Sequence, residues 1–387
     1  MRADIAIIGG GLAGSTAAAM LGRAGIDTIL IDPHETFPPD FRCEKLDSSQ
    51  VSVLRKTGIA DEVLAATTAD RTFWSARFGQ LIEKRAGDQH GIMYDDLVNA
   101  VRATIPANVT RAKAMVTHIA TSADRQDLRL SDERTVSARL IVLASGLNIG
   151  LRHLIGIERK VLSPCFSITI GFDMKPVGRP AFDFDSMSYY AEHPSDQTAY
   201  LTLFPIGSKT RANLFTYRKP DDPWLREIRN NTVETLHRLM PGLMRLSGPF
   251  EVTSQVRARP ADLYVSEGHV QPGIVLVGDA FCTTCPASGR GTSMVFTDVE
   301  RLCNIHLPRW LSSAGMDTSK IEAFYDDPVK RACDAEAVAT AHRFKSISID
   351  EGFKWTMERW ARFGVRYAAG MARNLHERGT ARIGRAT

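Results

Sequence analysis

The sequence predicts an α/β fold: a Rossmann-like domain, an antiparallel β-sheet inserted into it, and a C-terminal helical segment. Three observations support this prediction. A glycine-rich turn lies between two apolar runs near the N-terminus, the middle of the chain alternates apolar and polar residues, and a second buried run near residue 275 ends in Gly-Asp. Helix-linked strands at both ends, with hairpins between them, are typical of a domain that carries an insertion.

The composition fits a folded protein with a large core. The chain has 387 residues, of which 44% are hydrophobic and 24% charged, and its net charge of +4 gives no case for nucleic-acid binding. No apolar run approaches the ~20 residues that span a bilayer. The chain enters a core strand almost at once, so we expect no signal peptide. The 6 cysteines do not suggest a disulfide framework, so a cytoplasmic location is predicted.

The N-terminal motif is the opening of a dinucleotide-binding βαβ unit. An apolar strand over residues 5–8 leads into a glycine turn, an alanine-rich helix, a second strand over residues 28–31 and an acid. The glycines allow a tight turn, a close approach of the backbone to a pyrophosphate, and close helix packing, while the acid accepts hydrogen bonds from a ribose. The candidate cofactor residues here are Gly9, Gly11, Leu12, Ala13, Gly14 and Asp32. This motif alone does not separate FAD from NAD.

A second motif near residue 278 separates the two cofactors. A buried run ends in Gly278-Asp279-Ala280, and a Pro-x-x-Gly-x-Gly turn follows from Pro286 to Gly291. With both motifs, the sequence resembles the FAD-dependent monooxygenases of the para-hydroxybenzoate hydroxylase type, which include ubiquinone-pathway hydroxylases and geranylgeranyl-reductase-like flavoproteins. The resemblance implies that the acid binds the flavin ribityl chain and that the turn opens a helix facing the isoalloxazine. It adds the candidates Gly278, Asp279, Pro286, Gly289, Arg290, Gly291 and Thr292, with Asp298 as a recurrent acid of the helix.

A third, altered motif lies between the other two. The strand over residues 139–144 ends in Ser145-Gly146, where the family has Asp-Gly, and Arg152 matches the arginine of the family. Ile149 stands where a serine is usual. The resemblance implies NADH or NADPH as the reductant, but Ser145 weakens the case for direct reduction by a nicotinamide.

The loop after Asp32 brings further candidates to the cofactor. The resemblance implies that Arg42 reaches the FAD phosphates and that Cys43, Glu44 and Lys45 lie near the flavin. Alternatively, Glu44 and Lys45 point outward and pair with each other on a solvated loop. No side chain emerges as a clear catalytic group, because the flavin carries the chemistry. The weak candidates are Cys43, Lys45, Cys285 and Pro286.

The Cys282-x-x-Cys285 pair has three interpretations. A metal site is not expected, because no second ligand pair lies nearby. A thiol pair that exchanges with the flavin, or a flavin linked through Cys282, is an alternative. Buried cysteines that pack the cofactor cavity are the favoured interpretation.

The middle of the chain predicts the substrate-binding part. Alternating runs separated by turn residues predict an antiparallel sheet of hairpins, which in the hydroxylase relatives covers the substrate. Tyr189, Tyr200 and Phe204 are candidates for an aromatic pocket, although each of them fits a core position equally well.

The chain beyond residue 302 is predicted to be helical. Its last part, from Phe353 to Arg385, mixes aromatic residues with arginines, so a basic amphipathic helix on a membrane surface is one interpretation. The favoured one is that the aromatics pack on the protein itself while the arginines are solvated. The residues concerned are Phe353, Trp355, Trp360, Phe363, Tyr367 and Met371, with Arg359, Arg362, Arg366, Arg373, Arg378, Arg382 and Arg385.

These patterns give four segments and one leading function. The expected segments are an FAD-binding domain at 1–160, a substrate-binding β-sheet domain at 161–262, the second part of the FAD-binding domain at 263–310, and C-terminal helices at 311–387. The resemblance implies a monooxygenase that hydroxylates an aromatic or unsaturated small molecule through a flavin C4a-hydroperoxide. The alternatives are a reductase or dehydrogenase of an unsaturated or isoprenoid substrate, a flavin-dependent halogenase, and a non-catalytic FAD-bound partner protein.

Overall fold

A parallel β-sheet flanked by helices forms the first of two units into which the chain divides. The structure is a computed structural model that describes residues 1–365, 367 and 368. Unit 1 comprises Met1–Thr67, Ile92–Pro164 and Asp262–Ala339, and unit 2 comprises Thr68–Gly91, Cys165–Ala261 and Thr340–Thr387.

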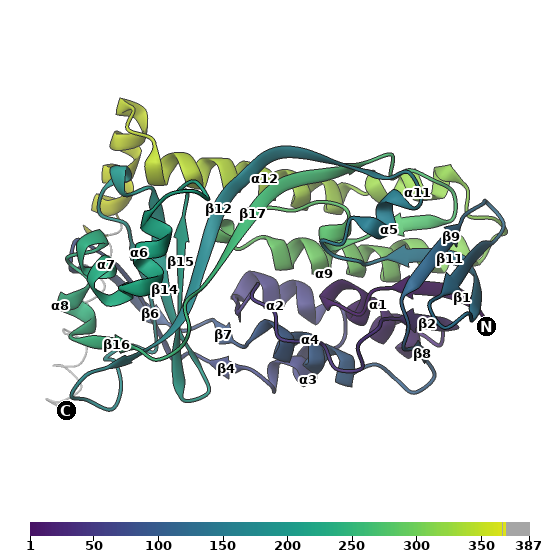
Figure 1. Cartoon of the computed structure of the whole chain (residues 1–387), viewed down its shortest axis with the longest axis horizontal. Helices are drawn as coiled ribbons and strands as arrows, with labels where there is room; N and C mark the ends of the chain where they lie inside the picture. Colours follow the sequence, from purple (N-terminus) through teal and green to yellow (C-terminus); the bar gives the residue numbers. More distant parts are fainter. Residues whose placement is uncertain (366, 369–387) are drawn as a thin grey trace, which may run out of the picture. The chain divides into compact units, whose positions relative to one another are not determined.

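The sheet of unit 1 joins the two ends of the chain. Its strands run in the order β8-β2-β1-β11-β10-β9, and β18 pairs in parallel with the end of β11 (Figure 1). The register places Ile8 of β1 beside Leu143 of β11, and Leu276 of β18 beside the same leucine. The strands are β1 (Arg2–Ile8), β2 (Thr28–Ile31), β8 (Thr110–Ala112), β9 (Val116–Ala120), β10 (Gln126–Leu130), β11 (Thr135–Leu143) and β18 (Ile274–Leu276).

Both faces of this sheet are buried, which is why β1 and β11 read as nearly continuous apolar runs. Ile5, Ile7 and Leu140 pack in one core with residues of α1, α4 and α9, and Ile8 and Leu143 pack in a second core on the opposite face. The helices are α1 (Leu12–Arg23), α2 (Ser48–Arg55), α3 (Ala60–Leu64), α4 (Tyr94–Ala103), α5 (Gly150–His153), α9 (Gly291–Arg301), α10 (Leu307–Leu311), α11 (Thr318–Tyr325) and α12 (Pro328–Ile349), the last of which continues into unit 2.

Unit 2 is built on the predicted hairpin sheet. The order is β16-β12-β15-β14-β13-β5-β6, and β17 pairs with β12. All registered pairs are antiparallel except β13 with β5, which is parallel. The strands of this sheet are β5 (Thr72–Arg77), β6 (Gln80–Ala86), β12 (Glu158–Pro176), β13 (Ser186–Tyr190), β14 (Thr198–Ile206), β15 (Lys209–Thr216), β16 (Phe250–Val252) and β17 (Arg257–Glu267). The short strands β4 (Thr68–Ala69) and β7 (His90–Gly91) pair with each other outside this sheet. The predicted α/β class is confirmed. Residues 72–86 also belong to this sheet, which was not predicted.

One face of the second sheet packs on α6 (Trp224–Asn230), α7 (Thr232–Leu239) and α8 (Met244–Ser247). A further helix over 353–365 also belongs to unit 2. Its Trp360 stacks on Phe78 with ring centroids 5.9 Å apart, and Phe363 meets Phe78 edge-on at 5.8 Å. Trp360 and Phe363 therefore pack on the protein itself, as expected, but the expectation is wrong for Phe353, which is 83% exposed. Arg366, Met371, Arg373, Arg378, Arg382 and Arg385 lie outside the described residues.

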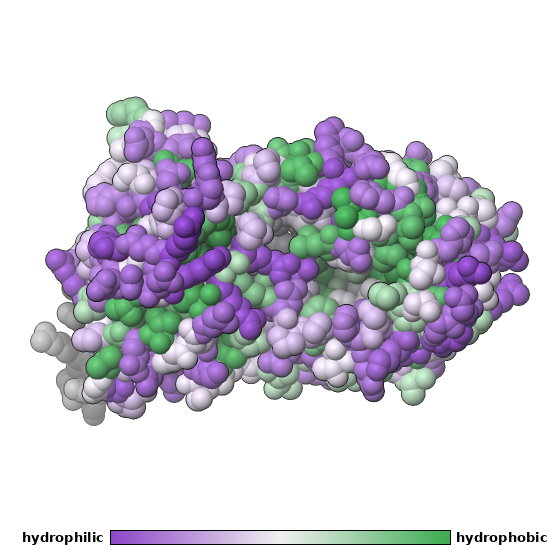
Figure 2. Space-filling model, in the orientation of Figure 1, coloured by the Kyte–Doolittle hydropathy of each residue, from purple (hydrophilic) through white to green (hydrophobic). Residues whose placement is uncertain are grey.

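The prediction that the arginines of this helix are solvated is wrong for Arg359. Only 8% of this residue is exposed, because its guanidinium donates to the carbonyl oxygens of Ile347 and Asp350 at 3.0 and 2.7 Å. Within the described residues, no helix has both the length and the apolar character needed to cross a membrane. Figure 2 shows hydrophilic side chains spread over most of one face, with apolar areas interspersed among them.

A buried carboxylate fixes the start of α12. Asp327 accepts hydrogen bonds from the backbone N–H groups of Val329 and Lys330, from Arg301 at 2.9 Å and from His306 at 3.1 Å. Burial alone would raise the pKa of Asp327, but these hydrogen bonds outweigh it and lower the pKa to about 2. Because the folded-state pKa lies below the ordinary value of 3.8, the stabilisation is present above that value and is lost as the pH falls toward 2.

We therefore expect Asp327→Asn to lower the free energy of unfolding by on the order of 2 kcal/mol near neutral pH. The difference from the unsubstituted protein should shrink as the pH is lowered toward 3. Urea unfolding at several pH values measures both effects. Asp326→Asn is the matched control, since Asp326 is exposed and pairs with Arg331 at 3.7 Å. Equal losses in the two variants, or a loss that is independent of pH, would contradict this account.

Candidate functional site

The glycine turn of unit 1 is packed too tightly for side chains at two positions. Gly9 has φ +102°, and a Cβ there would lie 2.5 Å from the carbonyl oxygen of Ala144. A Cβ at Gly14 would lie 1.9 Å from the carbonyl oxygen of Gly9. Both glycines are therefore needed for β1, α1 and the end of β11 to meet.

Gly11 differs from its neighbours because it faces open space. Its φ of −73° suits any residue, and the nearest atom to a Cβ there would be Cε2 of Phe37 at 3.9 Å. Gly11 is also the N-cap of α1, where no side chain accepts a hydrogen bond and the first turn holds no acid. The first N–H groups of α1, from Leu12 and Ala13 onward, thus form an uncapped positive helix end beside an open approach.

Asp32 lies at the end of β2 and closes the glycine turn. Its carboxylate accepts from the backbone N–H of Gly10 at 2.7 Å and from Arg102 at 3.0 Å. Arg102, on α4, also donates to the carbonyl oxygen of Gly10 at 2.8 Å. Arg102 was not predicted as a site residue, because a single arginine in an amphipathic helix carries no signal that its side chain points inward.

The two cofactor motifs converge from opposite ends of the chain. A Cβ at Gly278 would lie 3.5 Å from the Cβ of Ala13, and Arg42 donates to Asp279 at 2.6 Å. The same guanidinium donates to Asp40 at 2.6 Å and lies 5.6 Å from the centre of the Tyr94 ring. Arg42 was expected at the FAD phosphates. In the structure it donates to Asp279, the acid that was expected to bind the ribityl chain.

A buried charge cluster holds the Gly278-Asp279 turn from one side. Asp298, on α9, accepts from the backbone N–H of Gly278 at 2.9 Å and from Lys330 at 2.6 Å. Lys330 is 1% exposed and also donates to Asp334 at 3.1 Å. Burial, the main cause, and the nearby Asp298 charge raise the pKa of Asp334 to about 6, against the opposing effect of Lys330. Asp298 was expected near the cofactor as the recurrent acid of this helix, but Lys330 was not predicted as its partner.

Two residues hold the same turn from its other side. Arg152, which matches the family arginine, is fully buried and donates to the carbonyl oxygen of Ala280 at 2.9 Å. The hydroxyl of Tyr264 donates to the carbonyl oxygen of Asp279. The side chain of Asp279 itself stays 30% exposed. Ser145 is also partly exposed, and its hydroxyl lies 3.4 Å from the carbonyl oxygen of Asn148.

The predicted turn before α9 is present and meets the loop after Asp32. Pro286 opens a short 3₁₀ turn that ends at Gly289, whose carbonyl oxygen accepts from Gln50 at 2.6 Å. α9 then begins at Gly291. Its N-cap residue is Arg290, and no side chain caps the first N–H groups of this helix. The Cys43 thiol, which lies 2.9 Å from the carbonyl oxygen of Lys45, also bonds Thr292 in the first turn of α9.

The cysteines of this region are poor nucleophiles. Burial raises the pKa of the Cys43 thiol, and it raises the pKa of Cys282 well above its ordinary value. Cys285 is fully buried. All six cysteines belong to the described part of the chain, and none of them is in a disulfide. The described residues also contain no His, Cys, Asp and Glu group suited to a metal ion.

The alternative of a solvated loop at Glu44 and Lys45 is wrong for the glutamate. Glu44 is 2% exposed, and its carbonyl oxygen accepts from the backbone N–H of Ile92 at 3.0 Å. Lys45 is partly buried in the short strand β3 (Lys45–Leu46). This loop is therefore part of the folded core of unit 1.

The three aromatic candidates of unit 2 lie on different faces. Tyr189 is fully buried against α6–α8, and its hydroxyl donates to Glu192 at 2.5 Å, so it is a core residue rather than a pocket residue. Its neighbour Tyr190, on the opposite face of β13, lines a cavity. Tyr200 lies near Tyr190, Phe215 and Phe344, with ring centroids 4.8 to 5.9 Å away. Phe204 is fully buried.

The residues of unit 1 fit FAD. The uncapped end of α1 beside Gly11 suits a pyrophosphate, since a side chain there would fill the approach that the structure leaves open. Asp32 and Asp279 are carboxylates with lone pairs beyond their present bonds, as ribose and ribityl hydroxyls require. The uncapped end of α9 suits negative charge on a reduced flavin ring.

Comparisons with known proteins point to the same cofactor. The model of a family described as FAD binding domain matches residues 2–307. The 3-demethoxyubiquinol 3-hydroxylase of Escherichia coli (strain K12) is 24% identical over 329 residues, which cover 78% of this chain and 79% of that protein. The 6-hydroxynicotinate 3-monooxygenase of Bordetella bronchiseptica is 25% identical over 326 residues, covering 78% and 82%. The crystal structure of p-nitrophenol 4-monooxygenase PnpA from Pseudomonas putida DLL-E4 has a TM-score of 0.74 at 16% identity, covering 95% of this chain and 94% of that one.

Two glycine variants separate folding from cofactor binding. Gly11→Ala should leave the stability of the flavin-free protein unchanged, because its Cβ meets no atom closer than 3.9 Å. It should weaken FAD binding by about tenfold or more, since the methyl group narrows the approach to α1. Gly14→Ala should destabilise the flavin-free protein as well, because of the 1.9 Å clash. Thermal unfolding of the flavin-free protein and FAD titration by fluorescence measure the two effects. Wild-type FAD affinity in Gly11→Ala would refute this placement of the pyrophosphate.

Removal of the Lys330 charge should be strongly destabilising. Lys330→Met leaves Asp298 buried without its cation, so we expect a loss of about 3–5 kcal/mol in the free energy of unfolding. Asp298→Asn combined with Lys330→Met should recover part of this loss, because an amide oxygen can still accept from Gly278. Chemical unfolding of both variants provides the measurement. If the double variant is less stable than Lys330→Met alone, charge compensation is not the role of Lys330.

Proposed function

This chain belongs to the FAD-binding domain family, and we propose that it is an FAD-dependent monooxygenase that hydroxylates an aromatic or unsaturated small molecule. The observation that carries the proposal is the close approach of Gly278 to Ala13, in the first turn of α1, where a Cβ at Gly278 would lie 3.5 Å from the Cβ of Ala13. This contact supports one extended cofactor site built from both ends of the chain. Bound FAD accepts electrons from NADH or NADPH and activates oxygen.

The residues of unit 1 hold and orient the cofactor. Asp32 accepts from the adenosine ribose, the N–H groups at the start of α1 bind the pyrophosphate, and Asp279 accepts from the ribityl chain. Asp298 and Lys330 act through Gly278, because they fix the turn that presents Asp279. The uncapped start of α9, with Pro286 and Gly289 before it, would favour negative charge on a flavin ring bound beside it. No described side chain is assigned as an acid or base.

The sheet of unit 2 supplies the substrate pocket in this proposal, with Tyr190 in its lining and Tyr200 next to Tyr190 at a ring-centroid distance of 5.9 Å. The segment boundaries expected from the sequence and the cytoplasmic location also remain proposals.

The experiment is anaerobic reduction of the purified flavoprotein by NADH or NADPH, followed by mixing with oxygen. We expect tightly bound FAD, reduction by at least one nicotinamide, and an absorbing intermediate before reoxidation. A panel of phenols and aromatic acids under ¹⁸O₂ should give a product that carries the label. Flavin that reoxidises in one step, with no labelled product, would contradict oxygen transfer. A protein that binds no FAD would contradict the whole proposal.

A second candidate is a reductase of an unsaturated substrate without oxygen transfer. It is favoured by Ser145, which places a neutral hydroxyl where the hydroxylase motif has a carboxylate. The same stopped-flow experiment separates the two functions. A reductase should hand its electrons to an organic acceptor, and its reduced flavin should react with oxygen slowly and without label transfer.

A further inference from the structure

The helix over 353–365 leaves large apolar side chains exposed. Phe353 and Val365 are 83% and 70% exposed, more than any other large hydrophobic residue that the structure describes. Met357 and Trp360 are more than half exposed, although one face of the Trp360 ring stacks on Phe78. Single exposed apolar residues are normal on a protein surface, but four of them in one short helix indicate a surface that a partner covers.

These side chains lie on one side of the helix. Residues three and four apart share a face of an α-helix, and the exposed apolar positions follow this spacing. They form one continuous strip, which we call the apolar strip: Phe353, Met357, Trp360, Ala361, Gly364 and Val365.

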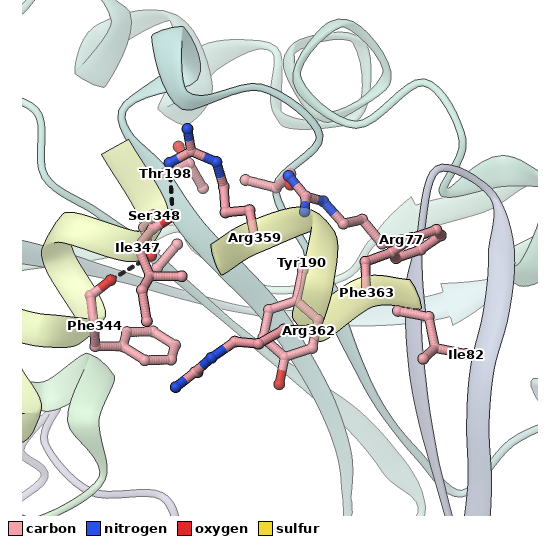
Figure 3. Close-up of a pocket in the computed structure, with 12 residues that line it drawn as sticks. Arg77, Ile82, Tyr190, Thr198, Phe344, Ile347, Ser348, Arg359, Arg362 and Phe363 are labelled. Atoms are coloured by element: carbon pink, nitrogen blue, oxygen red, sulfur yellow. Dashed lines mark hydrogen bonds between the residues drawn. The ribbon is translucent and has the colours of Figure 1, made fainter. Parts of the chain in front are cut away.

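The opposite side of the helix is fixed to unit 2. Arg359 donates to the carbonyl oxygens of Ile347 and Asp350, and Phe363 meets Phe78 edge-on at 5.8 Å. Arg359 and Phe363 also line a cavity of this unit (Figure 3). The apolar strip is therefore held in place before a partner arrives, so that docking does not have to order the helix first.

Exposed cations accompany the apolar strip. Lys354 is exposed and follows Phe353 directly in the chain. Glu358, the acid within the helix, lies 2.7 Å from Arg343 of α12 and 3.3 Å from Arg362. Both of these arginines are exposed, so the carboxylate of Glu358 is already paired where the two guanidinium groups face solvent.

The positive charge of the chain is concentrated in the segment that starts with this helix. Residues 351–387 contain 8 Lys and Arg against 3 Glu, a net charge of +5, so residues 1–350 carry −1 of the total of +4. This asymmetry attracts an anionic partner to the segment that carries the apolar strip. It also opposes docking of the strip on a second copy of the chain, because two segments of like charge would then meet.

We propose that the apolar strip binds the surface of a membrane that contains anionic phospholipids. The helix lies parallel to that surface, and Phe353, Met357 and Val365 enter the boundary between headgroups and acyl chains. Trp360 and Lys354 stay at the level of the headgroups, where an indole ring and a cation are both favoured. Side chains that project from a single helix make a convex strip, which a fluid lipid surface accommodates without a matching groove. The inference does not rest on the proposed function, since neither cofactor nor substrate takes part in it.

Co-sedimentation of the purified full chain with lipid vesicles tests the proposal. One set of vesicles contains equal parts of phosphatidylglycerol and phosphatidylcholine, and the other contains phosphatidylcholine alone. We expect at least about tenfold tighter binding to the anionic vesicles, because several cations contribute to the attraction, and a loss of this preference as salt is added. Equal binding to both sets, or binding to neither, would overturn the proposal.

Serine substitutions compare the apolar strip with another exposed valine. Phe353→Ser and Val365→Ser should each weaken binding to the anionic vesicles by about tenfold, because each removes the burial of one large apolar side chain in the lipid. Val177→Ser is the matched control, since Val177 is also exposed and belongs to unit 2 but lies outside the helix. Thermal unfolding should be the same for the three variants and the unsubstituted protein. Equal losses of binding in Val365→Ser and Val177→Ser would contradict the role of the strip.

Sedimentation equilibrium without lipid distinguishes the membrane from a second copy of the chain. We expect the unsubstituted protein and Phe353→Ser to have the same mass. A dimer that Phe353→Ser converts to a monomer would assign the apolar strip to contact between copies and would overturn the lipid proposal.

Discussion

The ion pair between Lys330 and Asp298 is the constraint on which the cofactor site depends. Lys330 is 1% exposed and donates to two carboxylates, and its ammonium group also lies 4.4 Å from the centre of the Phe281 ring. One of these carboxylates, Asp298, also accepts the backbone N–H of Gly278. The pair therefore joins α12 and α9 to the end of β18. Because Asp279 follows Gly278 directly, its side chain is presented to solvent from a turn that cannot shift without breaking a buried charge contact. The Lys330–Asp298 ion pair therefore both stabilises the fold and fixes the position of the turn that carries Asp279.

The cofactor motifs were predictable because each follows a local rule. Gly9 and Gly14 occupy positions where backbone packing excludes a Cβ, and Asp279 follows a buried strand. Such positions are recognisable from the spacing of a few neighbouring residues in the sequence. Arg102 and Lys330 were not predictable. Each lies on a helix more than 30 residues from its main partner, and only the tertiary fold decides that its charge points inward. Sequence patterns predict buried apolar faces well, but they do not tell which charged residue is paired inside.

The sheet of unit 2 illustrates a second limit. The alternation of residues 188–191 correctly predicted a strand, which the structure places at Ser186–Tyr190, but it did not predict which face of that strand meets the helices. Tyr189 and Tyr190 are adjacent, and a shift of one residue exchanges core and cavity. Residues 72–86 joined the sheet through a parallel pairing of β5 with β13, which no hairpin signal announces. Long-range pairing of this kind is set by the whole fold, not by local pattern.

Four cations of unit 1 are paired with carboxylates, whereas the fully buried Arg152 donates to a hydroxyl and a carbonyl oxygen. In unit 1, Arg42, Arg102, Arg301 and Lys330 each have a carboxylate partner within the chain. Such pairs make the site rigid before any ligand arrives, which suits a cofactor that stays bound. Unit 2 uses the same kind of pair away from the cofactor motifs, since Arg211 is 4% exposed and lies 3.0 Å from Asp173. Buried ion pairs are therefore common to both units. The cofactor site differs in that the carboxylates of Asp32 and Asp298 also accept the backbone N–H groups of Gly10 and Gly278, so the same charges that stabilise the fold position the two turns.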